Sequence, residues 1–125
     1  MRQTLLLVII FFHSCYLLSQ CIDGNCIQGN GVLISNNIST KYVGEFENGQ
    51  IHGNGKLYKI EYEKLNSDLY SKKEILVFDG LFENGNRKKG KAYDENEIII
   101  YDGEFAVKGD YLMRHGIGIS YTDQK

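Results

Sequence analysis

The sequence predicts an all-β fold in which stacked β-hairpin repeats form a short open solenoid or elongated antiparallel sheet, preceded by an N-terminal signal segment. The composition is the first observation: the 125 residues include 14 Gly, 9 Tyr and 6 Phe but no Pro or Trp. Glycine together with aromatic residues favours strands and tight turns over helices. A recurring glycine-aromatic motif is the second observation. The third is a set of Asn-Gly pairs, which suit tight reversals between strands.

The recurring motif is [Tyr/Phe]-x-Gly-x-Phe-x-x-Gly-x-x-His-Gly-x-Gly. It is clearest over residues 42–58 and returns in altered form from Phe78 and from Tyr101. A degraded half copy covers residues 24–31, with Cys26 in the place of the second aromatic residue. We predict structural roles for these repeat positions: Tyr42, Gly44, Phe46, Gly49, His52, Gly53, Gly55, Phe78, Gly80, Phe82, Gly85, Tyr101, Gly103, Phe105, His115, Gly116 and Gly118.

Each copy is expected to form a hairpin with one aromatic face. Alternate residues of a strand share a face, so Tyr42, Gly44 and Phe46 point one way, whereas Val43 and Glu45 point to solvent on the other. The central glycine leaves room for a closely approaching backbone. One hairpin cannot bury its aromatic face alone, but stacked hairpins can. The predicted core is therefore Tyr42, Phe46, Phe78, Phe82, Tyr101 and Phe105.

Two copies depart from the motif. Residues 87–90 read Arg-Lys-Lys-Gly where His-Gly-x-Gly is expected, and the last copy carries about four extra residues near 110–113. We expect these turns to bulge from the stack. Between Lys59 and Val77 the chain holds an insertion, which we interpret as a longer hairpin arm with a turn at 66–68. A short helix around 62–69 is the alternative.

The N-terminus has the order of a secretory signal peptide. Arg2 precedes the apolar run 5–12, and polar residues follow. The run is too short to span a bilayer, which takes about 20 apolar residues. We predict a signal peptide at 1–19 and a repeat domain at 20–125, with an uncleaved anchor or a buried strand as alternatives. Residues 12–15 also resemble a loose bacterial lipobox, which makes Cys15 a candidate lipidation site.

Export changes the interpretation of the cysteines. Cys21 and Cys26 are separated by four residues, and outside the cytosol such a pair favours a disulfide, with two free thiols as the alternative. The spacing is not the C-x-x-C of a thioredoxin-type site. Two sulfurs are too few for a cysteine zinc site.

The motif copies resemble MORN (membrane occupation and recognition nexus) repeats, which are short β-hairpin units. The resemblance covers residues 21–121 and is most specific over 42–58. The opening 21–31 resembles the start of exported bacterial MORN-type proteins, several of them lipoproteins. The resemblance implies stacked hairpins and either protein scaffolding or phospholipid binding.

No catalytic constellation stands out from the repeats. His52 and His115 occupy the same repeat slot, and Glu45 and Glu104 are likewise equivalent. No serine lies in a nucleophile elbow, and no Gly-rich segment forms a phosphate loop. We therefore predict no enzyme, cofactor, metal site or small-molecule substrate. The net charge of −2 and the export signal argue against nucleic-acid binding.

The leading hypothesis is a non-catalytic interaction or scaffold module at the cell envelope, in the periplasm, extracellular space or outer envelope. Its protein partner is unknown, and self-association through the terminal hairpin is expected. The alternative is a module that binds anionic phospholipid through a basic turn of Arg87, Lys88, Lys89 and Lys91. Acidic residues at 94, 95 and 97 would offset that turn, which is otherwise a solvated charged loop.

Overall fold

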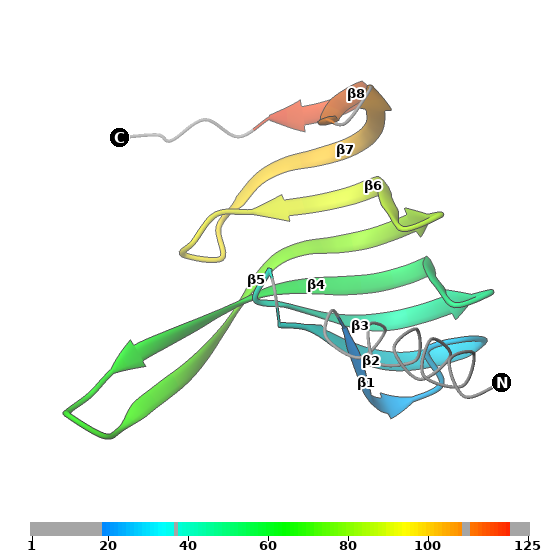
Figure 1. Cartoon of the computed structure of the whole chain (residues 1–125). Coiled ribbons are helices and arrows are strands. Elements are labelled where there is room, and N and C mark those ends of the chain that lie inside the picture. The colour runs from blue at the N-terminus through cyan, green and yellow to red at the C-terminus, as the bar shows by residue number, and fades with distance from the viewer. Residues whose placement is uncertain (1–18, 37, 109–110, 121–125) are drawn as a thin grey trace, which may run out of the picture.

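The computed structural model describes residues 19–36, 38–108 and 111–120. These residues form one eight-stranded antiparallel sheet with strand order β1 to β8, so each strand pairs with its neighbours in the chain (Figure 1). The all-β prediction is confirmed, and the described residues contain no helix able to cross a membrane. The predicted signal segment up to residue 18, with Cys15, lies outside the described residues.

The strands differ in length because an arm extends two of them. Their bounds are β1 (Gln20–Gly24), β2 (Gly29–Ser35), β3 (Thr40–Glu47), β4 (Gln50–Lys64), β5 (Tyr70–Glu83), β6 (Asn86–Tyr93), β7 (Ile99–Lys108) and β8 (Tyr111–Ser120). Short loops join most neighbours, as expected of an antiparallel meander.

A row of glycines crosses the whole sheet. In strand order from β1 to β8, these mutually paired residues are Gly24, Gly31, Gly44, Gly55, Gly80, Gly90, Gly103 and Gly118. A Cβ atom on Gly44 would lie 2.5 Å from the Gly55 Cα and 2.6 Å from the Tyr42 hydroxyl. A Cβ on Gly55 would overlap the Tyr42 ring. The glycines therefore bring an aromatic ring directly onto the backbone.

The six predicted core aromatic residues form one continuous stack on this row. All are buried, with at most 8% of their surface exposed. Neighbouring rings meet edge to face with centroids 5.0 to 5.5 Å apart, which is a favourable arrangement for aromatic pairs. The order along the stack is Phe46, Tyr42, Phe82, Phe78, Phe105 and Tyr101. The core prediction is confirmed.

Two-residue turns close the hairpins of the first two copies. Asn48 and Gly49 have φ values of 51° and 75°, and Asn84 and Gly85 have values of 49° and 81°. Positive φ at both central residues is the type I′ geometry that suits strand twist. The turns are also linked, because the Gly49 N–H donates to the carbonyl at residue 27 over 2.9 Å. The Gly85 N–H donates to the carbonyl at residue 51 over 2.8 Å.

The insertion between the first two copies is a hairpin arm. β4 and β5 stay paired out to Lys64 and Tyr70, and the arm projects from the sheet at the lower left of Figure 1. Ile60 and Ile75 are buried at its base, with 5% and 2% of their surface exposed. The alternative of a short helix around 62–69 is wrong, because alternating residues extend the ladder to a turn closed by the Leu65 N–H and the carbonyl at residue 69.

Replacing Gly55 by Ala tests the contact between ring and backbone. We expect Gly55→Ala to lower the free energy of unfolding by about 2 kcal/mol, because the new Cβ overlaps the Tyr42 ring in a packed core. Urea denaturation followed by circular dichroism measures the loss.

Gly49→Asn is the matched control. Nothing lies within 4 Å of a Cβ at Gly49, and Asn tolerates its φ of 75°, so this change should cost less than about 1 kcal/mol. Equal losses in the two variants would show that glycine flexibility, and not ring contact, is what matters at Gly55.

Candidate functional site

Two tyrosine hydroxyls form equivalent hydrogen bonds in the first and third copies of the motif. Tyr42 donates to the backbone carbonyl of Glu45 over 3.0 Å, and Tyr101 donates to that of Glu104 over 2.8 Å. Burial, and then the charge of Glu45, raise the pKa of Tyr42 to about 12. Tyr42 is thus a neutral structural donor at ordinary pH.

The repeat glutamates hold a bulge in the partner strand. The register between β3 and β4 shifts at Gly44 and Phe46, and the Glu45 carboxylate accepts a hydrogen bond from the Asn54 N–H. Gly53 has a φ of 69°, and a Cβ there would overlap this carboxylate. Glu45 lies on the face opposite the aromatic core, but it is only partly exposed, because its carboxylate is bonded to the backbone of the partner strand.

The third copy repeats this arrangement. Gly116 has a φ of 64°, and a Cβ at this position would overlap the Glu104 carboxylate. The two carboxylates thus have the same local role, which supports the expectation that they are repeat positions. Sequence reasoning missed the pairing of each glutamate with a glycine of the His-Gly-x-Gly segment. The sequence does carry a sign of this pairing, because the middle copy lacks both the glutamate and the glycine: Leu81 and Lys88 stand in their places.

Among the described residues, the His52 side chain contacts an exposed glutamate and no candidate nucleophile. His52 Nε2 lies 3.1 Å from Glu47 Oε2, in an exposed pair on the first hairpin. The His115 backbone pairs with Glu104, and its side chain lies outside the described residues. No group of three or more potential metal-ligating side chains occurs in the described part of the chain.

The predicted disulfide is present at the β1 edge of the sheet. Cys21 and Cys26 are bonded, with their Cα atoms 6.0 Å apart. Cys26 also packs against the aromatic core, and its sulfur lies 2.8 Å from where a Gly31 Cβ would be. Cys26 therefore fills the second aromatic slot of the degraded copy, as its position in the motif predicts. The alternative of two free thiols is wrong.

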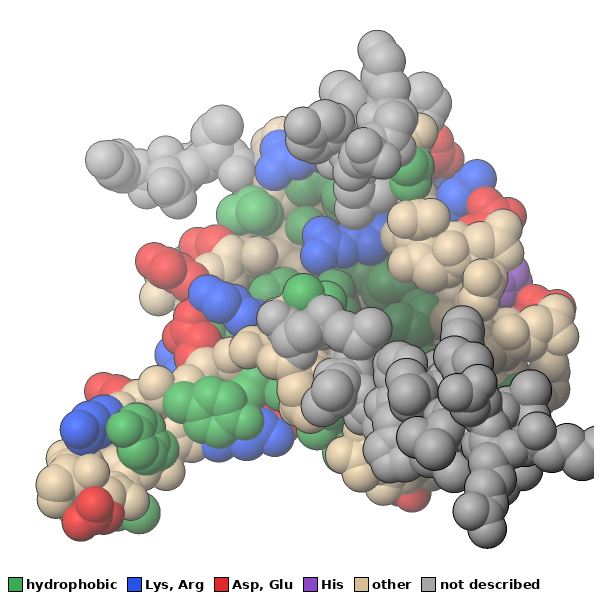
Figure 2. Space-filling view, in the orientation of Figure 1, with side chains coloured by type: hydrophobic (Ala, Val, Ile, Leu, Met, Phe, Trp, Pro, Cys, Tyr) green, Lys and Arg blue, Asp and Glu red, His purple; other side chains and the backbone are tan. Residues whose placement is uncertain are grey.

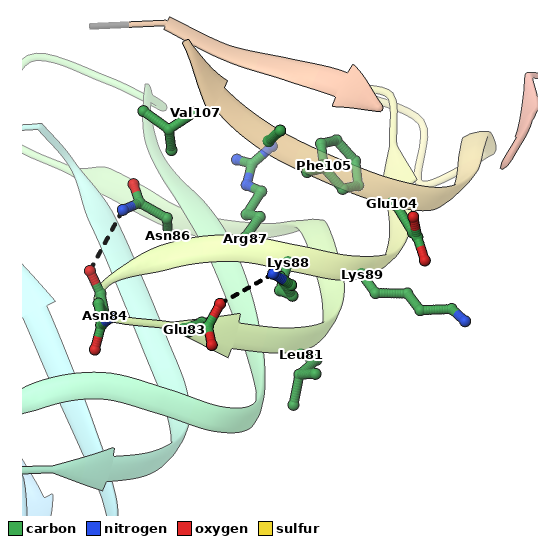
Figure 3. Close-up of a pocket in the computed structure, with 11 residues that line it drawn as sticks. Leu81, Glu83, Asn84, Asn86, Arg87, Lys88, Lys89, Glu104, Phe105 and Val107 are labelled. Atoms are coloured by element: carbon green, nitrogen blue, oxygen red, sulfur yellow. Dashed lines mark hydrogen bonds and ion pairs between the residues drawn. The ribbon is translucent and has the colours of Figure 1, made fainter. Parts of the chain in front are cut away.

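The four residues of the predicted basic turn do not share one surface. Lys88 pairs with Glu83 over 3.1 Å, and Lys89 extends away from Arg87 in Figure 3. Lys91 pairs in register with an aspartate on each neighbouring strand, at residues 79 and 102. The basic charges are therefore divided and partly balanced by acids.

A bulge explains the position of Arg87. β5 and β6 pair Leu81 with Lys89 but Phe82 with Arg87, so Lys88 is an extra residue in its strand. The extra residue reverses the alternation and places Arg87 on the aromatic face. Its guanidinium carbon lies 5.2 Å from the centroid of the Phe78 ring. Burial lowers the pKa of Arg87.

Arg87 separates two hollows. One is an open groove of about 620 Å³ on the aromatic face, and the other, drawn in Figure 3, has about 680 Å³ and lies between the second hairpin turn and β7. Figure 2 shows hydrophobic side chains at the floor of a hollow near the middle of the sheet, with Lys or Arg side chains at its rim. Arg87 and Asn86 line both hollows.

A scan against protein-family models and searches of curated proteins and of solved structures each returned no match to this chain.

The raised pKa of Tyr42 predicts a loss of stability in alkali. Above pH 10 the unfolded chain ionises its tyrosine, whereas the folded chain keeps Tyr42 protonated until its pKa of about 12. The free energy of unfolding should therefore fall as the pH rises from 10 towards 12. Urea midpoints measured along this range for the wild type and Tyr42→Phe will test it.

Phenylalanine at residue 42 cannot ionise, so the difference in free energy of unfolding between Tyr42→Phe and the wild type must change with pH. Near neutral pH it should be less stable by about 1 kcal/mol, because it lacks the hydrogen bond to Glu45. This difference in free energy of unfolding should shrink above pH 10. A gap that stays constant to pH 12 would contradict the shift.

Proposed function

We propose that the chain is an exported, non-catalytic MORN-type repeat protein that acts as an interaction or scaffold module at the cell envelope. Its sheet is built of stacked hairpin repeats, in the manner of a short open solenoid. The repeated parts support this proposal: paired aromatic rings, a central glycine, and in two copies a tyrosine bonded to the carbonyl of a glutamate.

The projecting arm is the observation that carries the proposed interaction role. Near its tip the large side chains of Tyr62, Leu65, Leu69 and Tyr70 are 53% to 64% exposed. Clustered exposed apolar side chains are typical of protein contact sites. Charged residues flank them, including Lys64, whose ammonium lies 6.0 Å from the centre of the Tyr70 ring. An arm of this kind suits a protein partner with apolar pockets and a polar rim.

Export is the second part of the proposal. A disulfide between Cys21 and Cys26 is favoured in oxidising compartments, which supports a location outside the cytosol. The apolar run at 5–12 also supports export, because it has the order of a signal peptide.

Self-association through the terminal hairpin β7–β8 remains part of the proposal, because β8 is an edge strand of the sheet.

Phospholipid binding through the basic turn is a weaker candidate. Lys88 is paired with Glu83, and Arg87 lies on the aromatic face while Lys89 and Lys91 lie on the other, so the four charges do not face one surface together. Basic residues contribute about 1 kcal/mol each when they face an anionic bilayer together, which this division opposes.

Photo-cross-linking in host cells tests the arm. A benzophenone side chain introduced at Leu65 or Leu69 should yield a cross-linked product in the envelope fraction. The same group at exposed Lys91, on the face of the sheet away from the aromatic core, should not. Replacing Tyr62 and Tyr70 by Ser should lower the yield roughly tenfold, because tyrosines are enriched among the residues that contribute most to protein interfaces.

The mass of the product identifies the partner class. A product of twice the chain mass means that the arm contacts a second copy of the chain. Equal products from the arm and from Lys91, or none from either arm position, would contradict an interaction role for the arm.

The intact non-reduced mass of the protein from its host tests export. We expect a chain that begins at Gln20 and is two hydrogens lighter than its reduced form. A chain that begins at Cys15 with added lipid mass would show that the mature protein is a lipid-anchored lipoprotein. A chain that retains residues 1–19 would contradict cleavage of a signal peptide.

A further inference from the structure

Arg87 differs in its burial from the other basic residues that lack an ion pair. Those with described side chains, such as Arg114 over the Tyr101 ring, are exposed. Five lysines of the described residues are paired with carboxylates: Lys41 and Lys72 with Glu74, Lys56 with Asp79, Lys59 with Glu61, and Lys88 with Glu83. Arg87 has no carboxylate within ion-pair distance in this part of the chain, although it is only partly exposed. It is thus a half-buried cation without a counter-ion.

The Phe78 ring compensates this charge only in part. Removing a cation from water is costly unless the cation is paired. A guanidinium over an aromatic face recovers part of this cost but forms no hydrogen bonds with the ring face. The planar guanidinium keeps donors that match a carboxylate in bidentate geometry. An anion that reached Arg87 would therefore meet a site with unused donors.

The groove on the aromatic face leads to this cation. Its walls include Leu33, Ile38, Ile51 and Leu57, and its lining also contains Arg87 and Asn86. The exposed lining is mostly apolar, and its volume of about 620 Å³ lies within the usual range of small-molecule sites. An apolar groove with one cation and one amide is complementary to a ligand with one apolar chain and one anionic group.

We propose that this groove binds a free single-chain amphiphile with a carboxylate head, its alkyl chain along the apolar walls and its carboxylate on Arg87. This ligand site goes beyond the interaction role of the arm. A flat bilayer fits the same residues less well, because the groove is concave and Lys89 and Lys91 lie on the opposite face of the sheet.

Calorimetric titration of the purified full chain with decanoate and with 1-decanol tests the proposal. The two probes share one chain and differ in the charge of the head. We expect decanoate to bind at least about tenfold more tightly at pH 7, because a charge-assisted pair contributes more than a neutral hydrogen bond.

Arg87→Met tests the head-group contact. Methionine keeps a flexible apolar stem over the Phe78 ring but removes the charge, so decanoate affinity should fall to that of decanol. Lys91→Met is the matched control, since it removes one positive charge from the opposite face. In this control the ratio of the two affinities should stay unchanged, and circular dichroism should show that both variants remain folded.

Ile38→Asp tests the groove independently of Arg87. Ile38 is 65% exposed, so its replacement should not unfold the chain, yet it lines the groove. Both probes should bind more weakly to this variant. Ile98, which is 61% exposed and outside the groove lining, supplies the control Ile98→Asp, which should bind both probes normally.

Several results would overturn the proposal. Equal affinities for decanoate and decanol in the wild type would remove the role of the cation. A preference for decanoate that survives Arg87→Met, or normal binding by Ile38→Asp, would place the ligand elsewhere. Co-sedimentation with phosphatidylglycerol vesicles without binding of monomeric decanoate would assign the anion contact to a membrane surface instead of the groove.

Discussion

Close contact between aromatic rings and glycine backbone is the constraint on which the rest of this structure depends. Most domains bury their core between two layers, but the described residues form a single sheet. The rings remain buried because they lie directly over a row of glycines and against one another. Tyr42 illustrates the requirement, since a Cβ at Gly44 or at Gly55 would collide with its side chain. The same contact fixes the register, because a shift by one residue would move every ring to the other face. Edge-to-face pairs then contribute about 0.5–1.5 kcal/mol each beyond the area that they bury.

This constraint leaves freedom only away from the glycine row. The arm lengthens β4 and β5 beyond the aromatic stack, so it adds residues without disturbing ring contacts. The bulges within the three hairpins β3–β4, β5–β6 and β7–β8 lie on the other side of the row, towards the hairpin turns. In the first copy the bulge is stabilised by the Glu45 carboxylate, which requires glycine at residue 53. In the second copy Leu81 replaces the glutamate, and a one-residue bulge at Lys88 replaces the wider one. Both of the surfaces for which we propose functions therefore lie where the motif is interrupted.

The sequence predicted those features that depend on local pattern. The aromatic core follows from alternation around Gly44 and its equivalents, the turns from Asn-Gly pairs, and the disulfide from the spacing of Cys21 and Cys26. The competing helix at 62–69 was the weaker prediction because its residues also alternate, and pairing between the two strands bonds the backbone groups that face each other in the arm. The position of Arg87 was not predictable in this way. Strict alternation from Gly90 would place residue 87 on the solvent side, and only the bulge at Lys88 reverses it. The register between neighbouring strands, and not the alternation within one strand, determines on which face such a residue lies.

The single-layer architecture also explains why the proposed ligand groove has its present location. Leu33, Ile51 and Leu57 contact the aromatic core but are only partly buried, because no described element packs above them. In a two-layer domain a second sheet or a helix would cover such side chains. Here an alkyl chain could supply the missing apolar contact, at about 25 cal/mol for each Å² that it removes from water. The bulge adds the second requirement, since it places a cation in the lining of the same groove with no carboxylate at ion-pair distance among the described residues. Apolar surface alone would bind any hydrocarbon, whereas the cation beside it selects a chain that ends in an anion.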